Sequence, residues 1–155
     1  PPYDAKYDYW GNFEHYASGN GIARSAVEAL SKNRETESVL EAIPIKKITS
    51  YEVFKAFEKK DALAIEVIDK AIIYWGMALA NLVSIFNPQQ VIYGGGVFGP
   101  ASQFLHRILE EAKKWAQPLS IKEVDLKASI LGGDAGLIGA GYLALKTLND
   151  SAHDE

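Results

Sequence analysis

The chain has 155 residues, of which 48% are hydrophobic and 23% charged, as expected of a globular domain with a hydrophobic core. The net charge of −4 and the scattered lysines and arginines argue against nucleic-acid binding, and zero cysteines exclude disulfides and thiolate zinc sites. The sequence shows no signal peptide, and its longest apolar run, 71–86, is shorter than the roughly 20 residues of a spanning helix, so we expect a cytoplasmic protein with no membrane partner.

The first third of the chain is predicted to be mainly helical. Residues 1–13 lack a clear period and favour a loop or a loose edge strand. A helix is predicted over about 18–32, and 35–48 predict a short helix closed by Pro44 and then a linker. The apolar residues of the first of these helices that are expected to be buried are Ile22, Ala26, Ala29 and Leu30.

Two helix starts are marked by capping residues in the middle of the chain. Thr49 and Glu52 form a capping box, and Asp61 is placed to cap a helix over about 62–86. This long segment has apolar residues nearly all round, which is typical of a central helix covered on most sides.

An Asn-Pro pair at 87–88 ends the long helix and leads into the region that organises the chain. A short apolar strand over 90–93 runs directly into three glycines, Gly94, Gly95 and Gly96. A helix from Pro100 to about Trp115 follows, with proline in the first turn, where its missing N–H costs nothing.

The last quarter of the sequence predicts a second strand and a final helix. Apolar and polar residues alternate over 124–128, which indicates a half-buried strand. A glycine turn at 130–134 ends in Asp134, a suitable N-cap for a helix over about 135–148, and the tail 149–155 is expected to fray. Two strands joined through a helix indicate a right-handed parallel crossover.

The spacing around the triple glycine leaves two interpretations open. A strand, a glycine turn and a helix start can hold a phosphate or nucleotide against bare backbone. A tight turn with glycines at positive φ explains the same residues. The sequence is neither a Walker loop, because no Lys-Ser/Thr pair follows, nor a dinucleotide fingerprint, because the glycine spacing differs.

Glu14 and His15 are a second candidate site, in a segment rich in aromatic residues and glycine. A carboxylate there can accept hydrogen bonds from the vicinal hydroxyls of a polyol, but a glutamate in a first helical turn is also explained by the helix dipole. His106 and His153 do not share metal-ligand spacing with His15, and no Ser/His/Asp set is readable.

Three motifs, taken together, resemble the ROK family (repressors, open reading frames and sugar kinases). Residues 11–19, Gly-Asn-Phe-Glu-His-Tyr-Ala-Ser-Gly, resemble its Gly-Cys-x-Glu-x-x-x-Ser-Gly stretch. Residues 87–97 resemble its Asn-Pro…Ile-Gly-Gly-Gly-Val segment, and 131–140 resemble its Leu-Gly-x-x-Ala-Gly-x-x-Gly-Ala terminus. The motifs occur in the family's order and span essentially the whole chain.

This resemblance implies an α/β fold, the C-terminal lobe of a two-domain, ribonuclease-H-like (actin-like ATPase) protein, helix-rich with a small sheet. The lobe would cover 1–148, with the sugar-site glutamate in 1–16 and a nucleotide-side α/β unit in 87–148. The implied full-length protein is an ATP-dependent hexose kinase of the glucokinase type that moves the γ-phosphate of Mg-ATP to the sugar 6-hydroxyl, and it is a homodimer. Glu14 would bind the hexose, with glucose first among the candidates, and Gly94, Gly95 and Gly96 would lie against the nucleotide.

The sequence departs from the family at the zinc loop, Cys-x-Cys-Gly-x-x-Gly-Cys, that often precedes the sugar-binding glutamate. Ala5, Tyr7 and Asn12 stand at the three cysteine positions, and none can supply a thiolate, so we predict no zinc. Packing of Tyr7, Tyr9 and Trp10 is expected to hold this loop instead.

The family's Asp-x-Gly-x-Thr phosphate loop and its catalytic aspartate belong to the N-terminal lobe, which is absent from this chain. We therefore expect no catalytic residue here and no activity from the chain alone. The alternative function is the sugar-sensing domain of a ROK transcriptional repressor. Such a protein would carry a helix-turn-helix domain upstream, and repressors usually keep the zinc cysteines.

Overall fold

The computed structural model describes residues 3–32 and 37–151. The N-terminal half is helical and precedes one long helix. Its elements are η1 (Ala5–Tyr7), α1 (Asn12–Ala17), α2 (Gly19–Lys32), η2 (Val39–Ala42), η3 (Ile45–Lys47), α3 (Ser50–Glu58) and α4 (Ala62–Phe86).

The C-terminal half contains both strands. Its elements are β1 (Gln90–Tyr93), η4 (Pro100–Phe104), α5 (Leu105–Ala112), α6 (Ser120–Glu123), β2 (Asp125–Ala128), η5 (Gly132–Asp134) and α7 (Ala135–Ser151).

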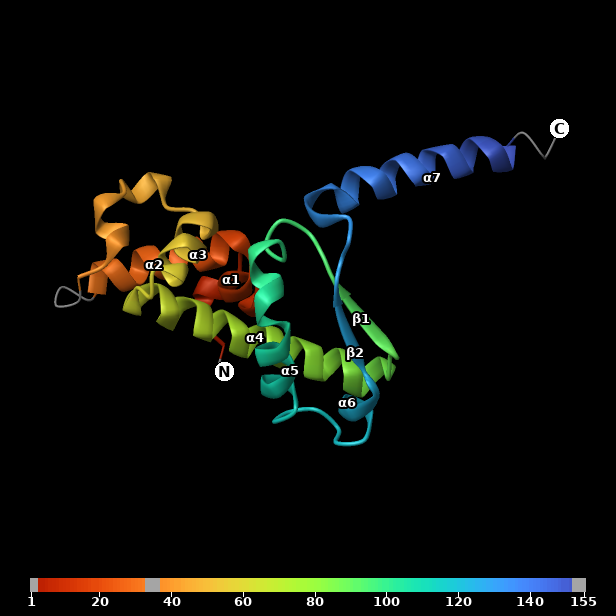
Figure 1. Ribbon diagram of the computed structural model, residues 1–155, viewed down its shortest axis with the longest axis horizontal. Helices are drawn as coiled ribbons and strands as arrows, with labels where there is room; N and C mark the ends of the chain where they lie inside the picture. Colours follow the sequence, from red (N-terminus) through yellow and green to blue (C-terminus); the bar gives the residue numbers. More distant parts are fainter. Residues whose placement is uncertain (1–2, 33–36, 152–155) are drawn as a thin grey trace.

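Helix α4 is the axis on which the other elements pack. Helices α1, α2 and α3 contact it on the N-terminal side of the chain, and α5 and α6 contact it from the C-terminal side (Figure 1). The predicted cap is confirmed, because the Asp61 carboxylate accepts from the Ala64 amide at 3.0 Å and from the Val39 amide at 2.8 Å. At the other end Asn87 adopts the left-handed conformation, with φ of 44°, and terminates the helix.

The hydrophobic core follows α4 and is continuous. The largest fully buried side chains in it are Ile22, Leu40, Ile68, Leu79, Ile108, Val53 and Val83. The prediction that α4 is covered on most sides is wrong at its C-terminal end. Ile85 and Phe86 are 72% and 69% exposed, and Leu82 is 44% exposed. The apolar pattern of α4 predicts that these side chains are buried, but no described element covers them.

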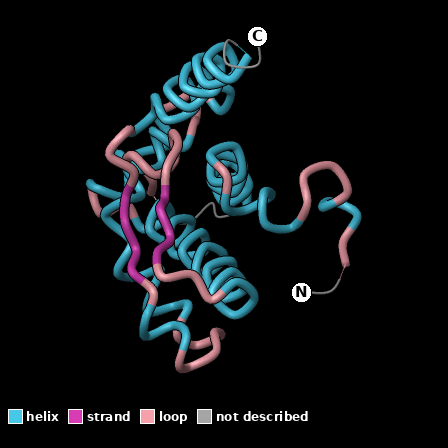
Figure 2. Tube along the Cα trace, turned by 90° about the vertical axis from the view of Figure 1, so that its right-hand side faces the viewer, coloured by secondary structure: helices cyan, strands magenta, loops and turns pink. Residues whose placement is uncertain are grey.

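The two strands form a parallel pair, with Gln90 opposite Asp125 and Tyr93 opposite Ala128. Figure 2 shows them side by side, with the N-terminal segment on the far side of the helices. The predicted strand at 90–93 and the parallel crossover are confirmed. In the described part of the chain neither strand has a second neighbour, and a sheet of two strands is marginal by itself.

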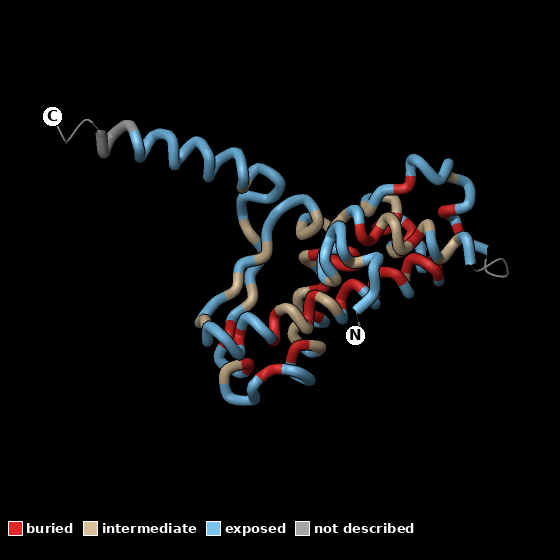
Figure 3. The backbone as a smooth tube through the Cα atoms, turned by 180° about the vertical axis from the view of Figure 1, so that it is seen from behind, coloured by how far each residue is buried: buried red, intermediate tan, exposed pale blue. Residues whose placement is uncertain are grey.

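Helix α7 extends away from the rest of the molecule (Figure 1), and its residues 136–147 are exposed (Figure 3). Leu137, Leu143 and Leu145 are 64–77% exposed. No described atom lies within 4 Å of a Cβ built at Gly136, Gly139 or Gly141. The small residues that predict close packing therefore have no neighbour within residues 3–32 and 37–151.

Several local predictions in the N-terminal half are corrected. Of the two alternatives for 1–13, the loop holds for 3–11, which contain the 3-10 turn η1 and no strand, whereas 12–13 begin α1 and residues 1–2 lie outside the described part. The helix predicted over 35–48 is two 3-10 turns, η2 and η3, with 35–36 outside the described part. The capping box of α3 is confirmed: Thr49 accepts from the Tyr51 amide, and Glu52 accepts from the Thr49 amide and hydroxyl.

Further corrections concern the C-terminal half. The helix predicted over 100–115 is divided into η4 and α5, it ends at Ala112, and Trp115 is 57% exposed rather than buried. Asp134 lies inside the turn η5, so it lacks the extended backbone of an N-cap. Helix α7 continues to Ser151, so 149–151 are helical rather than frayed, and 152–155 lie outside the described residues.

None of the described helices has both the length and the apolar character needed to cross a bilayer.

Candidate functional site

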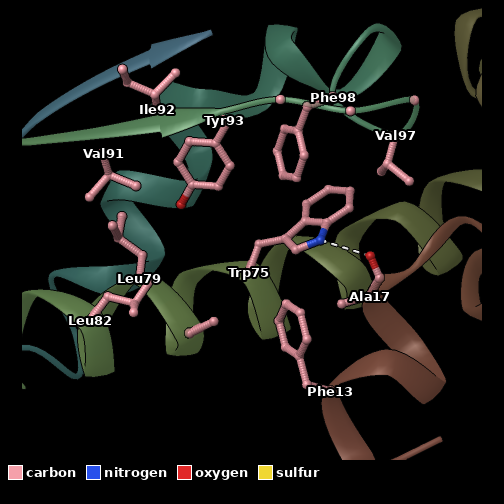
Figure 4. A pocket seen from close by; sticks show the side chains of 14 residues that line it. Phe13, Ala17, Trp75, Leu79, Leu82, Val91, Ile92, Tyr93, Val97 and Phe98 are labelled. Atoms are coloured by element: carbon pink, nitrogen blue, oxygen red, sulfur yellow. Dashed lines mark hydrogen bonds between the residues drawn. The ribbon is translucent and has the colours of Figure 1, made fainter. Parts of the chain in front are cut away.

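A cavity of about 490 Å³ lies beneath the triple glycine, between β1, α4 and α1. Figure 4 shows its aromatic and aliphatic walls. Phe13 and Ala17 of α1 line it, as do Trp75 of α4 and Tyr93 of β1. The segment that carries Glu14 and the segment that carries the glycines thus border the same space, although they lie far apart in the sequence.

The glycine turn presents open backbone at the upper edge of this cavity. Gly95 has φ of +85°, a conformation that favours glycine, and no atom lies within 4 Å of a Cβ built on Gly95 or Gly96. The turn is fixed at both ends: the Ser129 amide donates to the Tyr93 carbonyl at 2.6 Å, and the Phe98 amide donates to the Gly95 carbonyl at 3.1 Å. Bare backbone of this kind can approach a phosphate or a ribose closely.

Aromatic packing supports the turn from below. The Phe98 ring lies 4.5 Å from the Tyr93 ring and 5.0 Å from the Trp75 ring, centroid to centroid. The Trp75 indole N–H donates to the Ala17 carbonyl at 2.9 Å, which joins α4 to α1 (Figure 4). Burial raises the pKa of Tyr93 to about 12, so its phenol stays protonated at neutral pH. The cavity can therefore bind a ligand, but it offers no general base.

Glu14 lies on α1 but does not line the cavity. Its side chain is exposed, and among the described residues nothing donates to its carboxylate. Its backbone, in contrast, is tightly held. The Ser18 hydroxyl donates to the Glu14 carbonyl at 2.8 Å and accepts from the Gly21 amide at 3.0 Å. Glu14 is thus a carboxylate on a fixed backbone, free to accept hydrogen bonds from a ligand.

Gly21 allows the tight turn between α1 and α2. A Cβ at Gly21 would lie 2.6 Å from the His15 carbonyl oxygen and 2.7 Å from that of Glu14, closer than real Cβ atoms approach. Ser18 and Gly21 fix the backbone of Glu14, and the sequence analysis did not identify this role for either residue. Their spacing matches an N-cap and its N3 amide, which is the local signal that could have indicated it.

His15 faces the interior rather than a ligand. It is 6% exposed, and its ring packs edge-on against Tyr7 and Tyr16 at centroid distances of 5.6 and 4.7 Å. Burial lowers its pKa, and the positive charges of Arg24 and Lys6 lower it further, whereas Glu28 and Asp4 act in the opposite direction. His15 is therefore a neutral packing residue. His106 is exposed, and His153 lies outside the described residues.

Because the pKa of His15 is lowered, we predict that the protein loses stability as the pH falls below about 6.5, the ordinary pKa of histidine. A folded-state pKa below the unfolded value means that the unfolded chain binds the proton more readily. Stability is then full above the unfolded pKa and falls as the pH drops toward the folded pKa. Urea unfolding at pH 7.5 and pH 5 should show a lower midpoint at pH 5, and His15→Gln should flatten the difference. An equal pH dependence in both proteins would contradict this role.

The residues at the zinc-loop positions do not fit a metal. Ala5, Tyr7 and Asn12 include no thiolate, and the described residues contain no group of three His, Cys, Asp or Glu that could hold an ion. Tyr7 instead contacts Tyr16, with hydroxyl oxygens 3.3 Å apart. Tyr9 is 82% exposed, and its one ring contact among the described residues is edge-on against Trp10. Of the three residues expected to hold the loop, Tyr7 is therefore the one that packs inward.

Comparisons with known proteins point to one family. The sequence profile of the ROK family matches residues 9–147. The chain is 34% identical over 139 residues to a glucokinase of Halalkalibacterium halodurans, a match that covers 90% of this chain and 42% of the relative. The chain therefore spans less than half the length of the curated relatives that it matches.

Solved structures agree. A ROK family glucokinase from Streptomyces griseus, in complex with glucose and AMPPNP, superposes with a TM-score of 0.74 at 29% identity, covering 86% of this chain and 44% of that one. A ROK family transcriptional regulator, a homologue of the Escherichia coli Mlc protein, superposes with a TM-score of 0.66 at 27% identity, covering 81% and 32%. The predicted fold class, an α/β ribonuclease-H-like lobe of actin-like ATPase type with a small sheet, is confirmed.

Proposed function

This chain belongs to the ROK family, and from that membership we propose that it is the C-terminal lobe of an ATP-dependent hexose kinase of the glucokinase type. One observation carries the proposal. The glutamate segment and the glycine turn, which resemble the family's sugar and nucleotide motifs, border one cavity through Phe13 and Gly94–Gly96. Similarity to a glucokinase solved with glucose and AMPPNP supports the choice of ligands.

In this proposal each wall of the site has one role. The exposed Glu14 carboxylate accepts hydrogen bonds from hydroxyls of the hexose, and its charge makes these bonds stronger than neutral ones. The backbone of Gly94, Gly95 and Gly96, open at Gly95 and Gly96, lies against Mg-ATP, whose γ-phosphate moves to the sugar 6-hydroxyl. The catalytic base, the phosphate clamp and the ligands of Mg²⁺ come from the N-terminal lobe.

The exposed apolar surfaces support the existence of a second lobe. Residues 136–147 of α7 are exposed, each strand has one edge without a neighbour among the described residues, and the last turn of α4 exposes Ile85 and Phe86. Surfaces of this kind and size mark contact sites in soluble proteins. We propose that this lobe covers residues 1–148 and that the N-terminal lobe covers part of the exposed surface.

A second candidate function is the sugar-sensing domain of a ROK repressor, favoured by the similarity to the Mlc-related regulator. Sugar binding would then shift a DNA-binding domain upstream instead of preceding phosphoryl transfer. The absence of cysteine from the chain weighs against it, because the resemblance implies that repressors usually keep the zinc loop.

The full-length protein decides between the two. It should convert glucose and Mg-ATP to glucose 6-phosphate, detected with glucose-6-phosphate dehydrogenase, and mannose, N-acetylglucosamine and N-acetylmannosamine define the sugar class. No sugar phosphate from any of the four would reject the kinase. An upstream helix-turn-helix together with sugar binding but no turnover would support the repressor.

We also propose a cytoplasmic homodimer. An apolar groove over Phe13, Met77, Leu82 and Ile85, between α1 and α4, is a surface that a second copy could cover. Sedimentation equilibrium of the full-length protein should give twice the monomer mass, and a monomer at micromolar concentration would reject the dimer.

A further inference from the structure

Helix α1 is attached to α4 through two adjacent side chains, Tyr74 and Trp75. The Tyr74 ring stacks on the Tyr16 ring, with centroids 4.6 Å apart and planes 17° from parallel. The Trp75 indole donates to the Ala17 carbonyl. Both contacts lie within one helical turn of Glu14.

The Tyr16 ring is clamped from other sides as well. The Lys70 ammonium lies 4.4 Å from its centroid, a distance at which the cation is attracted to the ring face. The Tyr7 hydroxyl lies 3.3 Å from the Tyr16 hydroxyl, and the Lys6 ammonium lies 5.8 Å from the ring centroid. Tyr16 is accordingly 8% exposed, whereas the neighbouring Glu14 is exposed.

Helix α1 needs such contacts because it is short. It has six residues, well below the roughly 12 that an isolated helix requires, so its direction is set by tertiary packing. The described residues offer no metal cluster that could brace the segment instead. Loss of the Tyr16–Tyr74 stack would remove one of the two contacts from Tyr74 and Trp75 that attach α1 to α4, and leave the hydrogen bond from Trp75 to Ala17.

We propose that Tyr74 is a positioning residue for sugar recognition, which acts by stacking on Tyr16 and thereby holding α1 and the Glu14 carboxylate in place. The inference rests on the proposed function, because it takes Glu14 to be the sugar contact. Tyr74 does not line the cavity beneath the glycine turn, so its loss should affect the sugar and spare the nucleotide.

The test uses the full-length protein, glucose and Mg-ATP. Tyr74→Ala should raise the KM for glucose about three- to tenfold, as expected for the loss of one aromatic pair, and leave the KM for ATP unchanged. Tyr74→Phe keeps the ring and should restore the wild-type KM. Tyr74→Leu keeps apolar volume without the stack, so it tests the same point should the alanine variant fail to fold. Tyr9→Ala removes an exposed tyrosine of the same segment and is the matched control.

Hydrogen exchange supplies a readout that does not depend on activity. Amides of α1 should exchange faster in Tyr74→Ala and Tyr74→Leu, whereas those of α5 should not change. An unchanged glucose KM, or equal changes in the KM for glucose and for ATP, would overturn the inference. A wild-type protein that phosphorylates no hexose would overturn the proposed function, and in that case unchanged α1 exchange in the variants would show that Tyr74 does not hold α1 either.

Discussion

The 155-residue chain alone should form no sugar phosphate above the uncatalysed rate when it is given glucose and Mg-ATP. Among the described residues, Tyr93 is the only titratable side chain that lines the cavity beneath the glycine turn, and burial raises its pKa to about 12. A phenol that remains protonated at neutral pH cannot take the proton from a sugar hydroxyl. Glu14 is exposed and outside the cavity, so it is not placed to act as a base on a ligand held there.

Charge neutralisation is missing as well. Phosphoryl transfer depends almost entirely on positioning the reactants and on stabilising charge with metal ions and cationic side chains. No lysine or arginine lines this cavity, and the described residues hold no cluster that could bind a metal. One wall of glycine backbone can place a nucleotide, but it does not bring its γ-phosphate to an activated hydroxyl.

The chain and the full-length protein should be compared in the same coupled assay at equal concentration. Isothermal titration of the chain with glucose provides a control for folding, because an inactive chain that still binds sugar has kept its site. Turnover by the chain that is comparable with that of the full-length protein would show that the catalytic groups lie within these 155 residues, and would contradict the two-lobe proposal.

The elements that could be predicted from sequence are those whose determinants are local. Asp61 and Asn87 bound α4 as predicted, because a cap bonds to amides within a few residues and a left-handed terminator acts on its own backbone. Strand β1 has the predicted limits, because the Asn-Pro pair at 87–88 ends the preceding helix and the glycines from Gly94 end the strand. The capping box of α3 follows the same logic.

The predictions that were wrong depend on distant contacts. Apolar spacing from Pro100 onward is compatible with one helix, and only packing against α4 determines that a 3-10 turn precedes α5 and that the helix ends before Trp115. Helix α6 has four residues and no periodicity to detect. Asp134 has the composition of an N-cap, but the turn it occupies gives it a different backbone.

The candidate site divides in the same way. Glu14 and the three glycines could be proposed as site residues from sequence because each stands in a recognisable local motif. The role of Trp75 could not, because its hydrogen bond to Ala17 spans 58 positions and nothing in the apolar run of α4 distinguishes that side chain from its neighbours. His15 looked like a ligand-binding neighbour of Glu14, yet successive helical residues point in different directions, and this one points inward.

Glu14→Gln in the full-length protein should weaken glucose binding about five- to tenfold, because a charged hydrogen bond worth about 1.5–3 kcal/mol is replaced by a neutral one worth about 0.5–1.5 kcal/mol. The substitution keeps the shape and the first-turn position, so α1 should be unaffected. The carboxylate is exposed and its backbone is fixed by Ser18, which means that the change acts on the ligand contact rather than on packing. Isothermal titration with glucose measures it directly, without relying on turnover.

Glu58→Gln is the matched control. Glu58 ends α3 and is exposed, so the variant removes the same charge from another helix without touching the glutamate segment. Its glucose affinity should equal that of the wild type, and the affinity for a non-hydrolysable ATP analogue should be unchanged in both variants. If both Glu14→Gln and Glu58→Gln bind glucose with the wild-type affinity, Glu14 is not part of the sugar site. An equal loss in both would instead reflect net charge, because a specific hydrogen bond requires the carboxylate at one position only.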